Sequence, residues 1–316
     1  MSGEAARLRE HAARELSKAV TGQTGVIEQL LAVLLSGGHA LLEGVPGTAK
    51  TLAIKSLARL CRLGFQRVQS TPDLMPADIL GANIFDMATS RFVFHRGPIF
   101  TDLLLVDEVN RMPPRTQAAL LEPMEERQVT LDGSCHALSS YFTVFATQNP
   151  VEFEGTYPLP EAQLDRFWLK IRAAYPAAEA ETEMLERYQR GFDPHDLDSM
   201  GIEPAGDDWL AAARREVRDV RVEPCLFNYV SALTRRTRDW PSVSLGASPR
   251  ATVYLMLTAK TLAAFENRDY LIPDDVKAAA PLVLRHRLMI KPEAELEGIT
   301  PDRVVDEVLA AVEVPK

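Results

Sequence analysis

The stretch Glu43–Thr51 (EGVPGTAKT) combines the residue types that a phosphate-binding loop needs. It follows the pattern G-x-x-x-x-G-K-[ST], in which glycines let backbone N–H groups turn toward phosphate oxygens, except that Ala49 replaces the glycine before the lysine. Lys50 can place its charge on the β- and γ-phosphates, and Thr51 can offer a hydroxyl to Mg²⁺. The alternative is a strand–turn–helix connection with an incidental lysine. We interpret Ala49 as a position that requires a small side chain rather than a positive φ.

Two carboxylates, Asp107 and Glu108, follow directly after the apolar run Leu103–Val106. Phosphoryl transfer needs one carboxylate to hold Mg²⁺, often through water, and a second group to orient the attacking water. We therefore predict Asp107 as the metal-side acid and Glu108 as the candidate base. A charged strand end beside solvent is the alternative, but it leaves the co-occurrence with the glycine loop unexplained.

Asn149 ends another apolar run, and its amide could hydrogen-bond the attacking water or the γ-phosphate. Because Asn-Pro pairs commonly begin turns, a turn at Asn149-Pro150 is an equally good interpretation. Other catalytic chemistry is not indicated. The histidines are scattered without an H-E-x-x-H pattern, and the three cysteines form no cluster.

The elements that would position these residues alternate between strands and helices. A short apolar strand over 39–44 leads into the loop, and a helical pattern over 51–60 follows it. Further strands are predicted over 65–70, 102–110, 141–149 and 166–173. This alternation predicts an α/β domain with a parallel sheet, in which the wholly apolar run at 103–106 is typical of a central strand.

Two inserts interrupt this alternation, at about 83–97 and 128–138, and both are predicted as hairpins. The second contains Asp132-Gly133 between short β runs, which is a strong hairpin signal. In the first, Phe92 and Phe94 alternate onto one face, and packing beneath the hairpin is the favoured interpretation over contact with another protein.

After about residue 175 the strands largely stop, which predicts a second, helical domain over 176–316 beside an α/β domain over 1–175. Helices are predicted at about 178–190, 207–218, 223–238, 249–266 and 273–285. A length of 316 residues fits two domains.

The bulk composition narrows the function classes. The net charge of −9 and the pI near 5.3 argue against a protein that coats nucleic acid. No run of about 18 apolar residues and no signal-peptide pattern occur, so no membrane span is expected. With unclustered cysteines, a cytoplasmic location is the expectation.

Four stretches together resemble the MoxR family of AAA+ ATPases. They are GHALLEGVPGTAKT, FHRGPIFTDLLLVDEVNRMPPRTQAALLEPMEERQVTLDG, FATQNPVEFEGTYPLPEAQLDRF and SLGASPRA. In that family alanine commonly precedes the loop lysine, so Ala49 follows the family's pattern. The resemblance implies a P-loop AAA+ αβα sandwich with a parallel sheet, followed by a smaller, all-helical lid domain.

The resemblance also implies roles for individual residues. ATP or ADP would be bound by Gly44, Val45, Pro46, Gly47, Thr48, Ala49, Lys50, Thr51, Leu52 and Asp107, with Gly22 and Gln23 over the adenine. Thr51 and Asp107 would hold Mg²⁺, the latter through water. Glu108 and Asn149 match the Walker B base and sensor 1, while Arg166 and Arg250 match the arginine finger and sensor 2.

The positions of Arg166 and Arg250 in the sequence do not by themselves determine the roles of these two arginines. Arg166 could instead form a surface ion pair with Asp165 or Glu161. Arg250 follows a predicted Ser248-Pro249 helix start, where a cation is unfavourable unless an anion such as phosphate lies beside it. A solvated first-turn arginine is the alternative there.

The family resemblance implies a homo-oligomeric ring, usually hexameric, with ATP sites between subunits. Its work would be chaperone-like remodelling, maturation or cofactor insertion of a client enzyme, together with a von Willebrand factor A domain protein. A nucleic-acid motor is one alternative, disfavoured by the charge. A nucleotide-gated scaffold with little turnover is another, disfavoured by the joint presence of Lys50, Asp107, Glu108, Asn149 and Arg166.

Overall fold

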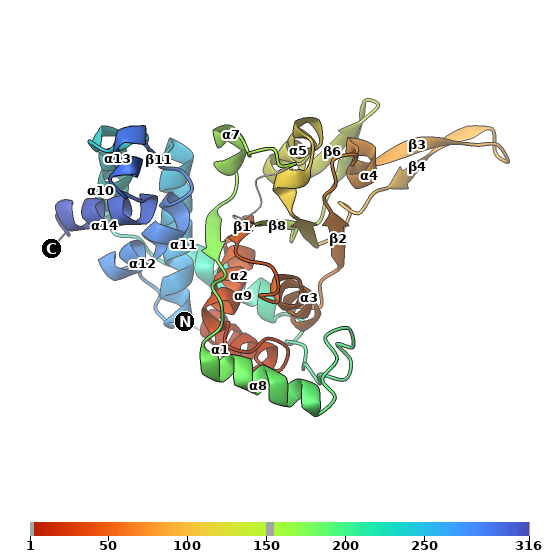
Figure 1. Ribbon diagram of the computed structural model, residues 1–316, viewed down its shortest axis with the longest axis horizontal. Helices are drawn as coiled ribbons and strands as arrows, with labels where there is room; N and C mark the ends of the chain where they lie inside the picture. Colours follow the sequence, from red (N-terminus) through yellow and green to blue (C-terminus); the bar gives the residue numbers. More distant parts are fainter. Residues whose placement is uncertain (1–2, 150–154, 316) are drawn as a thin grey trace.

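Parallel strands form the centre of the computed structural model, which describes residues 3–149 and 155–315 (Figure 1). Within those ranges, five strands make one sheet in the order β2-β5-β8-β1-β9, and every neighbouring pair is parallel. The strands are β1 (Ala40–Glu43), β2 (Phe65–Gln69), β5 (Leu103–Asp107), β8 (Thr143–Gln148) and β9 (Leu169–Arg172). The predicted α/β class is confirmed, and each predicted strand is present with trimmed ends.

Strand β5 is buried along its whole length, as its apolar run predicts. Because alternate side chains of a strand point to opposite faces, β5 contributes to two cores. Leu103 and Leu105 join the core beneath the long helices, whereas Leu104 and Val106 join the core on the other face. The carboxyl ends of β1, β5 and β8 therefore meet at one edge of a sheet that is covered on both sides.

Helices cover both faces of the sheet, which gives the αβα sandwich. On one face lie α1 (Glu4–Leu16), α2 (Thr24–Ser36) and α3 (Lys50–Leu60). Shorter segments cover the other face: α4 (Pro76–Leu80), the 3₁₀ turn η1 (Val109–Arg111), α5 (Pro114–Ala119), α6 (Leu121–Glu126) and α7 (Glu161–Leu164). The sequence analysis did not predict these short helices, whose few turns carry little periodic signal.

The predicted inserts form antiparallel hairpins. One pairs β3 (Gly81–Asp86) with β4 (Arg91–Arg96), and the other pairs β6 (Gln128–Leu131) with β7 (Ser134–Ala137). The second turns at Asp132 and Gly133, whose φ values of 48° and 79° fit the left-handed turn that the sequence signals. Figure 1 shows β3–β4 extending well away from the sandwich.

The aromatic residues of the first hairpin have different surroundings. Phe94 stacks on His136 of β7, with ring centroids 4.3 Å apart, so packing beneath the hairpin is confirmed for this residue. Phe92 is 72 % exposed and meets Phe85 edge-on, so the packing interpretation is wrong for Phe92. Phe92 pairs with Phe85 one step from the turn of the hairpin, whereas Phe94 pairs with Asn83 nearer its base.

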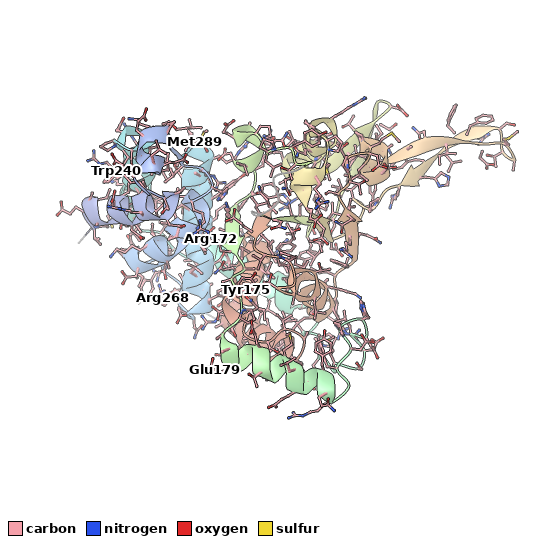
Figure 2. All side chains as sticks on the ribbon, viewed as in Figure 1. Arg172, Tyr175, Glu179, Trp240, Arg268 and Met289 are labelled. Atoms are coloured by element: carbon pink, nitrogen blue, oxygen red, sulfur yellow. The ribbon has the colours of Figure 1, made fainter. Side chains whose placement is uncertain are left out.

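The C-terminal part is mainly helical, as predicted. Its elements are α10 (Pro224–Arg236), η2 (Thr237–Asp239), α11 (Pro249–Phe265), α12 (Pro273–Leu284), α13 (Pro292–Leu296) and α14 (Pro301–Ala311), with a short strand pair of β10 (Val243–Leu245) and β11 (Met289–Ile290). Figure 2 marks Trp240 and Met289 in this bundle. Helices α13 and α14 were not predicted.

Two helices link the parts. Helix α8 (Ala178–Gln189) follows β9, and α9 (Trp209–Asp219) packs against α1 and α2. The domain boundary near residue 176 stays a prediction. No helix in the described part of the chain combines the length and the apolar character that a membrane crossing requires.

Candidate active site

A cavity of about 430 Å³ lies at the carboxyl edge of the sheet and gathers most of the predicted site residues. The predicted nucleotide-binding residues that line it are Gln23, Gly44, Pro46, Gly47, Thr48, Ala49, Lys50, Thr51, Leu52 and Asp107. Glu108 and Asn149 line it as well. Pro150 lies outside the described residues, so the turn interpretation of Asn149 stays open. Among the described residues, the lining does not include Gly22, Val45, Arg166 or Arg250.

The two loop glycines are required for different reasons. A Cβ at Gly44 would lie 2.4 Å from the carbonyl oxygen of Ala173 on the adjoining strand segment, so the loop passes β9 too closely for a side chain. A Cβ at Gly47 would meet no described atom within 4 Å, but its φ is +82°. Gly44 thus provides room and Gly47 provides backbone freedom.

Ala49 contradicts our interpretation of its position. Its φ of 56° and ψ of 23° place it in the left-handed region, immediately before the first residue of α3. Residue 49 therefore has to adopt a positive φ and is not restricted by side-chain size alone. The chain has a positive φ at both Gly47 and Ala49 where the loop turns into the helix. An L-residue with a Cβ accepts this conformation at a cost of about 1–2 kcal/mol.

We predict that Ala49→Gly stabilises the fold by about 0.5–1 kcal/mol, because glycine relieves this strain while adding some entropy to the unfolded chain. Chemical unfolding followed by circular dichroism measures the change. Ala278→Gly, at an exposed position inside α12, is the matched control and should destabilise by a similar amount. Equal destabilisation by both changes would contradict the strain at Ala49.

Lys50 points back over the loop that precedes it. Its Nζ donates to the carbonyl oxygens of Gly44 (2.8 Å) and Val45 (2.6 Å) and to Thr48 Oγ1 (3.2 Å). Burial lowers the pKa of this ammonium group, and the carboxylates of Asp107 and Glu108 act in the opposite direction. Lys50 is therefore a cation set at the N-terminus of α3, where the helix field also favours an anion.

Asp107 is held by side chains from several strands. Its Oδ1 accepts a hydrogen bond from Thr147 Oγ1 (3.0 Å), and its Oδ2 accepts one from Arg67 Nε (2.7 Å). Thr51 Oγ1 lies 3.5 Å from the same Oδ2. A hydroxyl and a carboxylate oxygen that converge in this way beside a phosphate loop fit Mg²⁺, which takes few protein ligands and completes its shell with phosphate and water.

Glu108 lies in the left-handed region, with φ 56°, so its side chain turns into the cavity at the end of β5. Its carboxylate is 3.0 Å from Arg111 Nε and accepts a hydrogen bond of 3.3 Å from Gln69 Nε2. Its backbone N–H donates to Thr147 Oγ1 (2.8 Å). Thr147 thus orients both acids, and the sequence analysis missed it together with Arg67 and Gln69.

Helix α8 forms one wall of the cavity, which the sequence analysis did not foresee. The cavity is lined by Ala180, Met184 and Tyr188 of α8, by Pro176 just before it, and by Val20 and Gln23 of the N-terminal segment. Gly22 has φ +70°, and a Cβ there would lie 2.6 Å from that of Ala180. Figure 2 marks Tyr175 and Glu179 where the chain passes from β9 into α8. The apolar lining fits a flat aromatic base.

Comparisons with known proteins agree with this geometry. Residues 39–169 match the family described as ATPase family associated with various cellular activities (AAA), and residues 235–308 match the AAA lid domain. Chaperone MoxR1 of Mycobacterium tuberculosis is 42 % identical over 97 % of this chain and 82 % of its own length. The chain belongs to the MoxR family of AAA+ ATPases.

Other matches cover nearly the whole length. YeaC of Bacillus subtilis, which has no assigned function, is 43 % identical over 96 % of this chain and 94 % of its own. A solved structure from Cytophaga hutchinsonii, described as a candidate ATPase, superposes with a TM-score of 0.89 at 39 % identity, over 99 % of this chain and 97 % of that one. The predicted AAA+ sandwich with a helical lid is confirmed.

In this MoxR chain Arg166 and Arg250 both pair with Glu125, and neither lines the cavity. Arg166 Nη2 lies 2.9 Å from Glu125 Oε2, and Arg250 Nη2 pairs with Oε1 of the same carboxylate. Ser248 caps α11 by accepting from the Ala251 N–H (3.2 Å), as predicted. Two carboxylates lie beside Arg250: Glu125 and, 3.7 Å from Nη1, Asp165. Within the described residues, Arg166 pairs with Glu125 rather than with the expected Asp165 or Glu161.

Arg287, which sequence reasoning missed, fixes the segment that carries Arg166. This side chain is almost fully buried, and it donates to Asp165 Oδ1 (2.8 Å) and to the carbonyl of Phe167 (2.7 Å). Ser248 Oγ donates to Asp165 Oδ1 (2.9 Å), so α11 and the end of α7 are tied to one carboxylate. In Figure 1, α7 lies between the sandwich and the lid.

Proposed function

We propose that this MoxR protein binds ATP with Mg²⁺ in the 430 Å³ cavity and hydrolyses it to ADP and phosphate. The observation that carries the proposal is the convergence of Lys50, Thr51, Asp107, Glu108 and Asn149 on that cavity from the ends of β1, β5 and β8. These are the groups that phosphoryl transfer needs, since catalysis there consists of positioning and charge stabilisation.

Each residue would then have a defined task. The loop N–H groups and Lys50 bind the phosphates, while Thr51 and Asp107 hold the metal, which when bound neutralises charge on the β- and γ-phosphate oxygens. Glu108, oriented by its contacts with Gln69 and Arg111, accepts a proton from the attacking water. Asn149 orients that water or the γ-phosphate.

We further propose that Arg166 and Arg250 act on the site of a neighbouring subunit in a homo-oligomeric, usually hexameric, ring. Support comes from their position at Glu125, apart from the chain's own cavity. Because Arg166 follows α7 of the sandwich and Arg250 begins α11 of the lid, any shift of the lid against the sandwich would change how both are presented.

The work proposed for hydrolysis is chaperone-like: remodelling, maturation or cofactor insertion of a client enzyme in the cytoplasm, with a von Willebrand factor A domain protein as partner. The name of the relative MoxR1 supports a chaperone. The protruding β3–β4 hairpin supports protein contact, because Ile84, Phe85, Met87 and Phe92 are about half to mostly exposed at 52 %, 49 %, 86 % and 72 %. The net charge of −9 does not favour nucleic acid.

The proposal predicts Mg²⁺-dependent phosphate release from ATP by the purified protein. Lys50→Met should weaken ATP binding by roughly 10–100-fold, because a charge-assisted contact with phosphate is lost. Fluorescence anisotropy of a labelled ATP analogue measures the affinity. Lys277→Met, on α12 next to Asp274, removes the same charge away from the cavity and should bind ATP like the wild type. Binding of ATP without measurable turnover would favour a nucleotide-gated scaffold instead.

A further inference from the structure

Arg67 belongs to none of the motifs that predict the site, yet its side chain lines the cavity. It lies on β2, where it pairs in register with Leu105 of the neighbouring β5. Its Nε is 2.7 Å from Asp107 Oδ2, and its Nη2 donates to Gln69 Oε1 at 2.9 Å. The arginine side chain is half exposed, whereas that of Asp107 is 11 % exposed. A half-exposed cation therefore neutralises a largely buried carboxylate.

The ion pair between Arg67 and Asp107 involves Oδ2 of the aspartate, and the choice of this oxygen is important for metal binding. Asp107 Oδ1 is turned toward the hydroxyl of Thr147, so Oδ2 is the oxygen on the side of Thr51. Mg²⁺ held by Thr51 and Asp107, directly or through a water ligand, would therefore lie beside Oδ2. The guanidinium of Arg67 already occupies that oxygen, and two cations beside one carboxylate oxygen repel each other.

We propose that Arg67 is the counter-ion of Asp107 before the metal binds, and that Mg²⁺ must displace it to enter the site. The inference rests on the proposed function, since it concerns the metal that accompanies the nucleotide. Arg67 thereby sets the Mg²⁺ concentration at which the site fills, and it is a positioning residue because it acts through Asp107.

Displacement of Arg67 would also affect Glu108, the candidate base. Arg67 Nη2 binds Gln69 Oε1, and Gln69 Nε2 binds Glu108 Oε2 at 3.3 Å. Asp107, Arg67, Gln69 and Glu108 therefore form one continuous chain of polar contacts along the ends of β2 and β5. Gln69 thus contacts both Arg67 and Glu108, so movement of Arg67 away from Asp107 is linked through Gln69 to the orientation of Glu108.

The test is a Mg²⁺ titration of protein saturated with a fluorescent ADP analogue, in which the fluorescence of the bound analogue reports metal entry. Arg67→Gln should lower the Mg²⁺ concentration for half-maximal change by about 5–10-fold, because the metal no longer competes with a half-exposed ion pair. Arg67→Lys keeps the positive charge beside Asp107 and should stay closer to the wild type than Arg67→Gln does. Arg303→Gln, which removes an exposed arginine beside Glu307 on α14, is the matched control and should change nothing.

A double substitution distinguishes competition between Arg67 and Mg²⁺ for Asp107 from an indirect structural effect of the Arg67 substitution. In an Asp107→Asn background, Arg67→Gln should no longer shift the half-maximal Mg²⁺ concentration, because the shared oxygen has lost its charge. An unchanged or higher half-maximal Mg²⁺ concentration in Arg67→Gln overturns the inference alone. Failure of the wild-type chain to bind the ADP analogue overturns the proposed function, and the inference with it.

Discussion

Glu108→Gln is expected to retain ATP binding and to reduce ATP turnover by roughly 10²–10⁴-fold, the usual contribution of a positioned general base. The amide has nearly the same shape as the carboxylate and can still contact Gln69. It cannot accept a proton from water, and it loses the ion pair with Arg111. Phosphate release at saturating ATP measures the turnover, and the affinity for a labelled ATP analogue measures binding.

The comparison needs a carboxylate that has no part in the site. Glu10→Gln, on the exposed side of α1, removes the same charge and should turn over ATP at the wild-type rate. A Glu108→Gln protein that keeps turnover within about 3-fold of the wild type would show that the base lies elsewhere. Loss of ATP binding in that variant would instead make Glu108 part of the nucleotide-binding surface.

The residues that sequence alone placed in the cavity are those at the ends of apolar strands. Lys50 follows the loop after β1, Asp107 is the last residue of β5, and Asn149 follows β8. Because parallel strands end at the same edge of a sheet, the convergence of these residues follows from the topology. The sequence analysis could not identify Arg67 and Gln69 as site residues. They lie on β2, whose residues are mostly exposed and carry no motif, and only the register with β5 brings Gln69 opposite Asp107.

Two other kinds of feature could not be predicted from the sequence: the backbone conformation of single residues and contacts between residues far apart in the chain. Alanine is compatible with a helical or, at some cost, a left-handed backbone, so the identity of Ala49 could not reveal its φ of 56°. The sequence predicts that residues 178–190 form a helix, but it does not predict that this helix lines the cavity. The pairing of Arg166 and Arg250 on Glu125 joins residues that are far apart in the chain, from α6, the end of α7 and the start of α11.

Arg166→Ala is expected to have the larger effect on turnover, a loss of about 10³–10⁵-fold, if the arginine stabilises the charge on a neighbour's transferring phosphoryl group. ATP binding and assembly should persist, because Arg166 lies outside the cavity of its own chain. Phosphate release and the mass of the assembly in solution are the measurements. Arg190→Ala, beside Glu186 at the end of α8, is the matched control with an exposed arginine.

Mixing two inactive proteins tests whether the arginine acts across subunits. Arg166→Ala keeps its own site but lacks the arginine, whereas Glu108→Gln keeps the arginine but lacks the base. In a head-to-tail ring, about a quarter of the interfaces in an equal mixture would combine an intact site with an intact arginine, so a similar share of wild-type activity should return. If Arg166 served its own chain, each subunit would stay inactive and the mixture would recover nothing. Recovery in the mixture would therefore place Arg166 in the nucleotide site of its neighbour, which would explain why Arg166 does not line the cavity of its own chain.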